Sequence, residues 1–267
     1  MNALLGDIQM NNNSEILKKL KELAPWHMDI QINETLSTKD GNQDFYDDPN
    51  HRNTSVIGVQ DMLRLFNKLY PRGLNGKSFL DVACNAGGYC FLANQMGASF
   101  VHGFDVRSHW IKQALFLQEH IPNSDNIIFE VKDFDNFHFS KMYDITLFKG
   151  ILYHLLDPIW AIKKICEITR EVIILDSAYD IRSPKDCLRI QFESQSHIMS
   201  GVDKLSWFPG GPDVVIKLLN YFGFKCTRVV FNKPYTGDNT ANLGRMRILA
   251  SRSSDTFTDY DKGNLTY

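Results

Sequence analysis

The stretch FLDVACNAGGY, residues 79–89, decides how this chain folds. It begins as a buried type of β-strand with an acid, Asp81, near its end, and it continues with small residues and two glycines, which are typical of a turn before a helix. A second apolar run, residues 100–104, ends in another acid, Asp105, 24 residues after Asp81. A strand-turn-helix-strand unit with an acid at the tip of its second strand is how an α/β sheet binds a nucleoside. We therefore expect Asp105 to accept hydrogen bonds from the ribose hydroxyls. Alternatively, Asp105 is the N-cap of the helix that begins near Ser108.

The turn also discriminates between nucleosides. A dinucleotide fingerprint reads G-x-G-x-x-G, so that backbone amides can approach a pyrophosphate. Here the first two of those positions are Ala83 and Asn85, and only Gly87 and Gly88 supply that freedom. Asp81 and Asn85 place an acid and an amide at the mouth of the turn. This pattern disfavours NAD and suits a ligand that carries an ammonium group.

The run resembles motif I of class I S-adenosylmethionine (SAM)-dependent methyltransferases, which is roughly D-x-G-C-x-x-G. The resemblance implies SAM as the cofactor and a Rossmann-like α/β fold, with a mostly parallel sheet, one antiparallel strand and helices on both faces. It implies cofactor contacts from the first turn and the next strand ends: Asp81, Ala83, Cys84, Asn85, Gly87, Asp105, Val106, Asp133 and Phe134. We place Lys149, at the tip of the fourth strand, in the same set; it suits an acidic substrate group or exposed strand carbonyls as well.

Alternating strands and helices support this fold class. Strands are expected at 78–82, 100–104, 127–131, 143–148 and 171–176, with an antiparallel pair at 224–232 and 245–251. Helices are expected at 14–23, 56–70, 88–96, 108–119, 157–168 and 212–222, and a short strand at 26–32. We divide the chain into an N-terminal helical extension (1–75), a methyltransferase domain (76–252) with an insertion at 178–210, and a polar, frayed tail (253–267).

Composition limits the function classes. The chain has 267 residues, a formal net charge of −2 and a pI near 6.4, which disfavour a large RNA substrate without excluding a local basic patch. Its five cysteines form no C-x-x-C pair, so neither a zinc site nor a redox motif is indicated, and no set of acids and amides indicates another metal. We found no membrane-length apolar run and no signal pattern, and we expect a cytoplasmic protein with free thiols.

Two residues are candidates for the chemistry of transfer. His154 and Tyr153 lie in GILYHLLDP, residues 150–158, which resembles the segment after the fourth strand of many methyltransferases. In that family the segment lines the active site. An imidazole can exchange a proton near neutral pH, so His154 is the candidate base. A structural role in an apolar run is the alternative for both residues.

The acceptor side is expected from segments outside the cofactor motifs. Trp26 and Arg52 lie in the N-terminal extension, and Trp207 opens the turn-forming run WFPGGP, which suits a lid over a small organic substrate or a loop packed on the sheet. Arg245 and Arg247 alternate along the last strand and therefore share one face, toward the pocket or toward solvent. We take Trp26, Arg52, Trp207 and Arg245 as substrate-side candidates.

The motifs at 79–89 and 148–158, with the extension, also resemble the tRNA wobble-uridine carboxymethyltransferases and related methyltransferases of glycan and natural-product pathways. The carboxymethyl enzymes are expected to have an arginine just after the Tyr-His pair, whereas Leu155 and Leu156 follow here. We therefore favour SAM-dependent methylation of a small molecule, such as a sugar, a glycan precursor or a secondary metabolite, on oxygen slightly before nitrogen. The alternatives are a tRNA-modifying enzyme and a catalytically silent binding subunit; the oligomeric state is left open.

Overall fold

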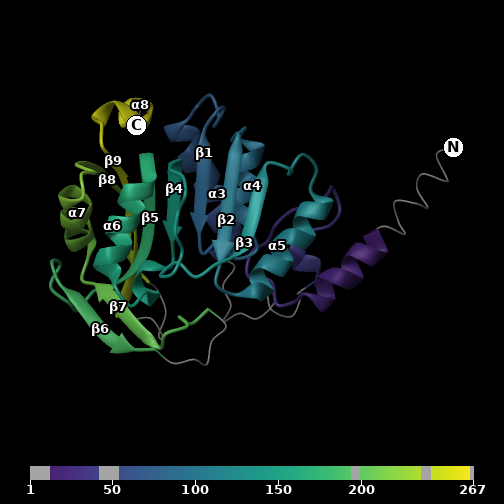
Figure 1. The fold of residues 1–267 in the computed structure, drawn as a ribbon, viewed down its shortest axis with the longest axis horizontal. Coiled ribbons are helices and arrows are strands. Elements are labelled where there is room, and N and C mark those ends of the chain that lie inside the picture. The colour runs from purple at the N-terminus through teal and green to yellow at the C-terminus, as the bar shows by residue number, and fades with distance from the viewer. Residues whose placement is uncertain (1–12, 42–53, 194–198, 236–241, 265–267) are drawn as a thin grey trace.

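The computed structural model of the chain describes residues 13–41, 54–193, 199–235 and 242–264. Within these residues, a seven-stranded sheet has the order β3-β2-β1-β4-β5-β9-β8 (Figure 1). Its strands are β1 Ser78–Val82, β2 Phe100–Asp105, β3 Ile127–Val131, β4 Tyr143–Lys149, β5 Thr169–Asp180, β8 Cys226–Pro234 and β9 Leu243–Ser251. β9 pairs antiparallel with both of its neighbours, and the other pairings are parallel. The expected α/β sheet with one antiparallel strand is confirmed.

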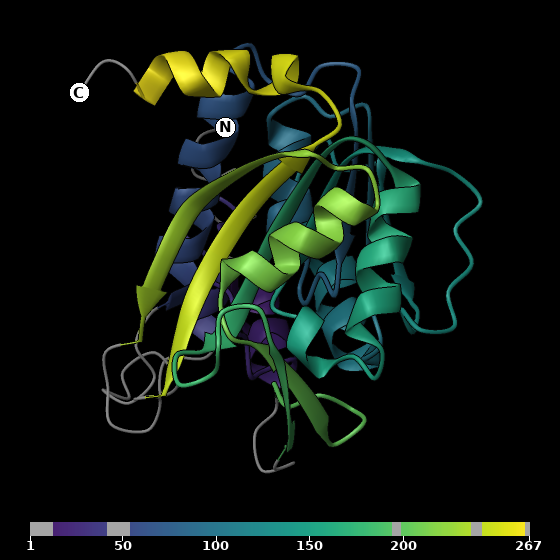
Figure 2. The ribbon, with the colours of Figure 1, turned by 90° about the vertical axis from the view of Figure 1, so that its left-hand side faces the viewer.

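Helices cover both faces of this sheet (Figures 1 and 2). Successive residues of a strand point to opposite faces, so Phe79 packs in one core and Leu80 in the other. The first core also takes α3 Thr54–Leu69, α4 Gly88–Gln95 and α5 Ser108–His120, and the second takes α6 Pro158–Ile168 and α7 Pro212–Tyr221. Burial on both faces explains the continuous apolar runs of the central strands.

The connection from β3 to β4, residues 132–142, contains no helix. Aromatic side chains cover the sheet there instead: the rings of Phe137 and Phe139 are 4.3 Å apart, and Phe137 lies 5.1 Å from Phe104 of β2. Phe134 belongs to the same cluster and packs 5.5 Å from Phe148 at the end of β4. This packing fixes Phe134 beside the carboxyl ends of the strands.

The N-terminal segment differs in part from expectation. A helix covers residues 13–22 as far as they are described, but residues 26–32 form only an isolated bridge, between Gln31 and Ser37, in place of a strand. The reason is local: the hydroxyl of Thr38 donates to the carbonyl of Met28 at 2.5 Å and accepts from the amide of Ile30 at 2.9 Å. These bonds satisfy the backbone without a neighbouring strand.

Two C-terminal segments are more ordered than expected. The insertion contains a hairpin of β6 Leu188–Phe192 and β7 Leu205–Pro209. Beyond the domain, η4 Ser254–Phe257 and α8 Thr258–Asn264 replace the expected frayed tail. Phe257 is fully buried, and Arg228 pairs with Asp261 of α8 at 2.7 Å, so the tail is tied to the sheet by an apolar anchor and an ion pair.

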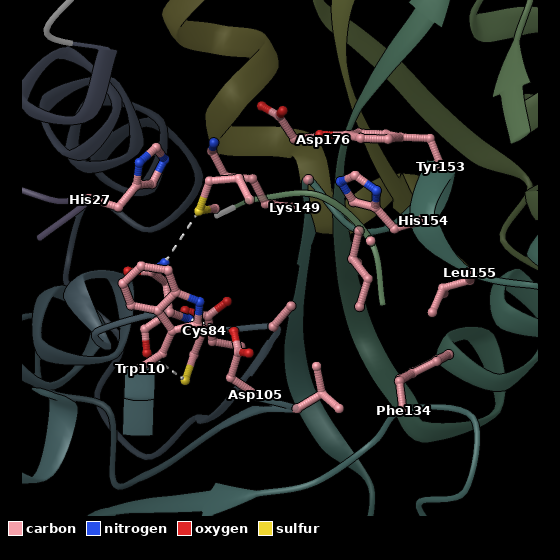
Figure 3. Close-up of a pocket in the computed structure, with 18 of the residues that line it drawn as sticks. His27, Cys84, Asp105, Trp110, Phe134, Lys149, Tyr153, His154, Leu155 and Asp176 are labelled. Atoms are coloured by element: carbon pink, nitrogen blue, oxygen red, sulfur yellow. Dashed lines mark hydrogen bonds between the residues drawn. The ribbon is translucent and has the colours of Figure 1, made fainter. Parts of the chain in front are cut away.

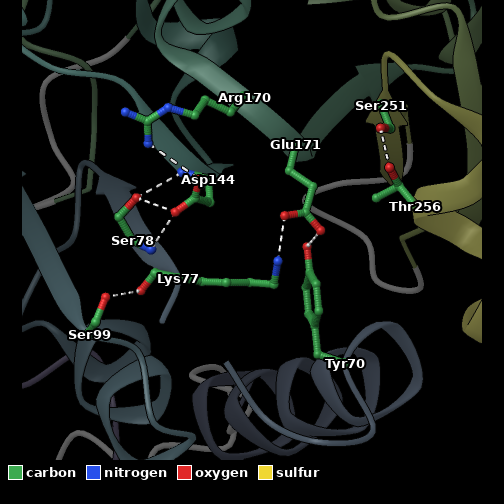
Figure 4. A network of polar contacts seen from close by, with 9 residues as sticks. All are labelled: Tyr70, Lys77, Ser78, Ser99, Asp144, Arg170, Glu171, Ser251 and Thr256. Carbon is green, nitrogen blue, oxygen red and sulfur yellow. Dashed lines mark hydrogen bonds and ion pairs between the residues drawn. The ribbon is translucent and has the colours of Figure 1, made fainter. Parts of the chain in front are cut away.

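A polar network joins the strands at the ends opposite the candidate site (Figure 4). Asp144 accepts from the amide and hydroxyl of Ser78 at 2.8 and 2.7 Å, and Glu171 accepts from Lys77 and Tyr70 at 2.5 and 3.2 Å. These contacts tie β1, β4 and β5 together, which keeps their carboxyl ends in register. Among the described residues, no helix has the length and apolarity that a membrane span requires.

Candidate active site

The carboxyl ends of the parallel strands open into a cavity of about 570 Å³ (Figure 3). This volume lies within the usual range for a small-molecule site, about 300–1,000 Å³. Its lining comes from the turn after β1, the ends of β2 and β4, the segment 132–135, the insertion, and residues 231–235 and 245–247. The sequence motifs and the C-terminal strands thus converge on one cavity.

The turn after β1 has an unusual backbone. Ala83 and Asn85 adopt φ of 61° and 52°, in the left-handed region that non-glycine residues rarely occupy, and Gly87 has φ of 80°. The amide of Cys84 between them donates to the carbonyl of Phe104 at 2.9 Å, which holds the turn against β2. Ala83 therefore adopts the glycine-like conformation of motif I despite its methyl group. Strained backbone of this kind clusters at functional sites.

Asp105 lies at the tip of β2, 5% exposed, with its carboxylate fixed by backbone. One oxygen accepts from the amide of Asn85 at 3.1 Å and the other from the amide of Arg107 at 3.0 Å. The residue that caps α5 is Arg107, so Asp105 is not the N-cap of that helix. A carboxylate has about four acceptor sites, so these two bonds leave capacity for a pair of hydroxyls.

Asp81 and Lys149 both line the cavity, and their charges interact. Burial raises the pKa of Asp81 to about 8, although the charge of Lys149 opposes that shift. Burial, together with repulsion from Arg245, lowers the pKa of Lys149 to about 8. The ammonium of Lys149 lies 5.6 Å from the ring centre of Tyr89, and no hydrogen bond or ion pair to it is present among the described residues. Burial thus favours the neutral form of each group, and the attraction between the two charges opposes it.

Val106 and the segment 132–135 form another part of the cavity lining. Asp133 accepts from the amide of Asp135 at 3.1 Å and from the side chain of Asn136 at 2.9 Å. Phe134 is 2% exposed and lines the cavity beside it. An apolar ring next to a fixed carboxylate provides a surface for a base and an acceptor for its amino group.

The part of the cavity that Lys149, Arg245 and Arg247 line, called the far half below, is basic. Asp176 lies within β5, beside the end of β4, and its two oxygens accept from the Nε atoms of Arg245 and Arg247, the latter at 2.7 Å. These side chains are 18% and 13% exposed, so both arginines face the cavity rather than solvent. Arg245, Lys149 and Arg247 hold the pKa of Asp176 down at about 2, against the effect of burial. Asp176 thus remains ionised.

His154 belongs to a short 3-10 helix, η2 Leu152–His154, and its ring is directed into the cavity beside Tyr153 (Figure 3). Its Nδ1 lies 2.9 Å from Oε2 of Glu193, which follows β6 in the insertion. The same oxygen accepts from the amide of Gly201 at 2.9 Å and from the hydroxyl of Ser206 at 3.1 Å. Burial lowers the pKa of His154, and the charge of Glu193 opposes that shift only in part.

Comparison with known proteins identifies the domain. Residues 74–201 match the family described as a methyltransferase domain. The chain contains a class I methyltransferase domain. The strand order places β9 antiparallel beside β5, and the β1 turn of this methyltransferase domain contains motif I. The cofactor of the family is SAM.

Curated relatives match part of this methyltransferase domain. The tRNA U34 carboxymethyltransferase of Campylobacter hominis is 32% identical over 102 residues, which are 38% of this chain and 35% of that protein. The enzyme of the same name from Helicobacter pylori strain G27 is 31% identical over 117 residues, 40% of this chain and 45% of that protein. The chain spans less than half the length of these relatives.

Solved structures share the fold of the methyltransferase domain over a longer range. The N-terminal domain of EvdMO1, solved in the presence of S-adenosylhomocysteine (SAH) and D-fucose, has a TM-score of 0.70 at 18% identity and covers 90% of this chain and 96% of that one. The magnesium protoporphyrin IX methyltransferase of Synechocystis with bound SAM has a TM-score of 0.51 at 16% identity, covering 74% and 79%. At these identities the likeness concerns the fold.

The residues of the methyltransferase domain fit SAM. Asp105 offers oriented acceptors for the ribose hydroxyls, Asp81 offers a carboxyl for the ammonium, and Phe134 offers an apolar face for the adenine. Two non-glycine residues in the left-handed region bend the backbone toward the same space. The cavity thus offers groups suited to the ribose, the ammonium and the adenine of the cofactor.

Most of the residues expected from the sequence line this one cavity, and a few do not. Gly87 lies outside the lining, because a side chain there would meet the ring of Phe129. Trp26 is fully buried in the core, where its indole donates to the carbonyl of Leu20 at 2.8 Å; the next two residues line the cavity instead. Trp207 on β7 also lies outside the lining. Arg52 falls outside the described residues.

The cavity also contains residues that the sequence did not single out as site residues. The contributors are His27, Met28, Arg107, Trp110, Asp176, Met199, Lys233, Tyr235 and Arg247. Asp176 had a detectable signal, since it ends the strand that the sequence predicts at 171–176, although β5 continues to Asp180. Glu193 had none, because its contact with His154 is made across the insertion, whose fold does not follow a local pattern.

Proposed function

We propose that this protein transfers the methyl group of SAM to a hydroxyl group of a small-molecule acceptor. The observation that supports it is the placement of His154, with a carboxylate partner, in the same cavity as Asp105 and the motif I turn. When bound, SAM supplies a methyl group on a positively charged sulfur, which an acceptor attacks with a lone pair. The protein has to align the acceptor, exclude water and remove one proton.

The His154–Glu193 pair favours oxygen over nitrogen as the acceptor atom. A carboxylate accepts hydrogen bonds and does not donate them, so Nδ1 of His154 carries the proton that bonds Glu193. This tautomer leaves the lone pair of Nε2 available to a hydroxyl. Burial lowers the pKa of His154, so the imidazole is neutral near pH 7. A neutral amine acceptor needs less help from such a base, whereas a hydroxyl acceptor gains directly from it.

The walls on the acceptor side favour a small molecule. Tyr153 stacks on Phe208 of β7, with ring centres 5.3 Å apart at an angle of 14°. Residues 199–203 of the insertion lie between the two halves of the site: Met199 accepts from the side chain of Asn85 at 3.9 Å, and Gly201 bonds Glu193. The insertion therefore covers the cofactor turn and the candidate base together, which limits the size of the acceptor.

The experiment measures SAH release from SAM over a panel of hydroxylated small molecules, with His154→Ala beside the wild-type protein. Loss of a general base lowers turnover by about 10²–10⁴-fold. We expect this loss in His154→Ala with SAM affinity unchanged. The control, His138→Ala, replaces an exposed histidine outside the cavity and should behave as wild type. Full turnover in His154→Ala would remove the base from the mechanism. SAM binding without turnover on any acceptor would instead support a silent binding subunit.

A second candidate function is tRNA modification, which is favoured by the names of the curated relatives. A net charge of −2 provides little general attraction for a polyanion, so a tRNA substrate would require a local basic surface. Binding of labelled tRNA at increasing salt distinguishes the two functions. Affinity that falls steeply and linearly with the logarithm of salt would support tRNA, and the absence of such binding would support a small acceptor.

A further inference from the structure

The far half of the cavity contains more positive charge than its own carboxylates balance. Lys149, Arg245 and Arg247 all line it. Asp176 supplies one ionised carboxylate, which bonds both arginines. The arginine pair therefore keeps one positive charge that no carboxylate among the described residues balances in a confined space. Buried charges are costly unless they are paired, so such an excess is a binding site for an anion.

The three cations have different neighbours. Lys149 is electrostatically coupled to Asp81 and lies near Tyr89. Arg245 and Arg247 project from β9 to Asp176, and Arg245 also reaches the hydroxyl of Tyr153. Asp176 fixes both arginines through their Nε atoms. The terminal nitrogens of Arg247 have no hydrogen-bond partner among the described residues, and a guanidinium edge is suited to bind two oxygens of a carboxylate or phosphate.

The arginine pair is also linked to the candidate base. Arg245 lies 3.5 Å from the hydroxyl of Tyr153, and the rings of Tyr153 and His154 are 4.2 Å apart. A molecule that binds the arginine pair with one end therefore lies in the same cavity as Tyr153 and His154. Since both arginines are mostly buried, this position admits a small ligand rather than the exposed backbone of a nucleic acid.

We propose, building on the methyl-transfer function above, that the acceptor is a small hydroxylated acid. Its carboxylate or phosphate group binds Arg247 and Arg245, and the hydroxyl that receives the methyl group lies at His154. Asp176 is a positioning residue, because it orients the arginines and contacts neither the acid group nor the reacting atoms.

Calorimetry on the protein saturated with SAH tests this inference with two probes, inorganic phosphate and D-lactate. We expect saturable binding of at least one of them, weakened about tenfold or more in Arg247→Gln. Arg247→Lys restores the charge and should recover part of that affinity. The control Lys217→Gln removes an exposed cation on α7 and should bind as wild type. Binding of phosphate alone indicates a phosphomonoester acceptor, and binding of lactate alone indicates a carboxylic acid.

Two measurements distinguish a failure of the acidic acceptor from a failure of the methyl-transfer function. SAH binding to wild type and to Arg247→Gln with equal affinity verifies that the variant is folded and that the cofactor side is intact. If wild type then binds neither probe, or Arg247→Gln binds them as tightly as wild type, the acidic acceptor is excluded while methyl transfer stands. If wild type does not bind SAH at all, the methyltransferase function itself fails.

Discussion

Nδ1 of His154 lies 2.9 Å from Oε2 of Glu193, so a residue of the motif after β4 meets a residue of the insertion 39 positions later. Glu193 is in turn fixed by the amide of Gly201 and the hydroxyl of Ser206. The insertion therefore does more than cover the cavity, because it selects the tautomer of the candidate base.

Glu193→Gln should lower turnover about tenfold or more without changing SAM affinity, because a neutral amide no longer enforces the Nδ1–H tautomer. The carboxylate of Glu193 raises the pKa of His154 against the effect of burial, so its removal should lower that pKa further. The acid limb of the pH–rate profile should then move to lower pH. Titration of the His154 imidazole by NMR measures the same shift without an acceptor. An unchanged His154 pKa would mean that the contact has no electrostatic effect.

SAM binding should release a proton from Asp81. In the free protein burial raises the pKa of this carboxyl to about 8, and an ammonium beside it favours the ionised form. Binding at pH 7 therefore drives a proton off, and affinity should rise with pH from about 6 to 8, by at most tenfold for each pH unit. Calorimetry in buffers of different ionisation enthalpy counts the released protons. Asp81→Asn should release none; equal release in wild type and variant would show that the proton comes from another group.

Asp176 should stabilise the fold at neutral pH. It is 1% exposed and bonded to two arginines, and removal of one partner of a buried ion pair costs about 3–5 kcal/mol. Its folded pKa, about 2, is below the ordinary value of 3.8, so the stabilisation is fully present above pH 4 and disappears as the pH falls through 2. The difference between Asp176→Asn and wild type in the free energy of unfolding should be largest at pH 7 and become smaller as the pH falls toward 2. Asp125→Asn, on an exposed loop, provides the matched control. A difference that does not depend on pH would argue against an ionised Asp176.

The cofactor half of the site could be predicted from the sequence because its determinants are local. The β1 strand, its turn and Asp105 follow one another along the chain, and parallel pairing places the ends of β1 and β2 side by side. The conformation of Ala83 could not be predicted, since nothing in an alanine indicates a left-handed φ. The only indication was that motif I of the family usually has a glycine, which tolerates such a φ, at the position of Ala83.

The acceptor half depends on long-range contacts, which a sequence does not display. Arg245 and Arg247 share a face of β9 in any register, but only the pairing of β9 with β5 brings them to Asp176 and into the cavity. Trp26 shows the opposite effect. An aromatic residue beside a histidine suggested a substrate contact, but Trp26 is buried in the core, where its indole N–H donates to the carbonyl of Leu20.

The most direct measurement is the affinity of the purified protein for SAM, by calorimetry, in wild type and in Asp105→Ala. Loss of hydrogen bonds to a charged group costs about 1.5–3 kcal/mol, so Asp105→Ala should bind SAM about ten- to a hundredfold more weakly. Asp105→Asn keeps one acceptor oxygen for one of the two backbone amides that Asp105 binds, those of Asn85 and Arg107, and Asp255→Ala, an exposed residue of η4, is the control. A wild-type protein that binds SAM, and an Asp105→Ala variant that is folded at the assay temperature but has lost that affinity, are the predicted result. Equal affinity in both proteins, or no SAM binding by the wild type, would contradict it.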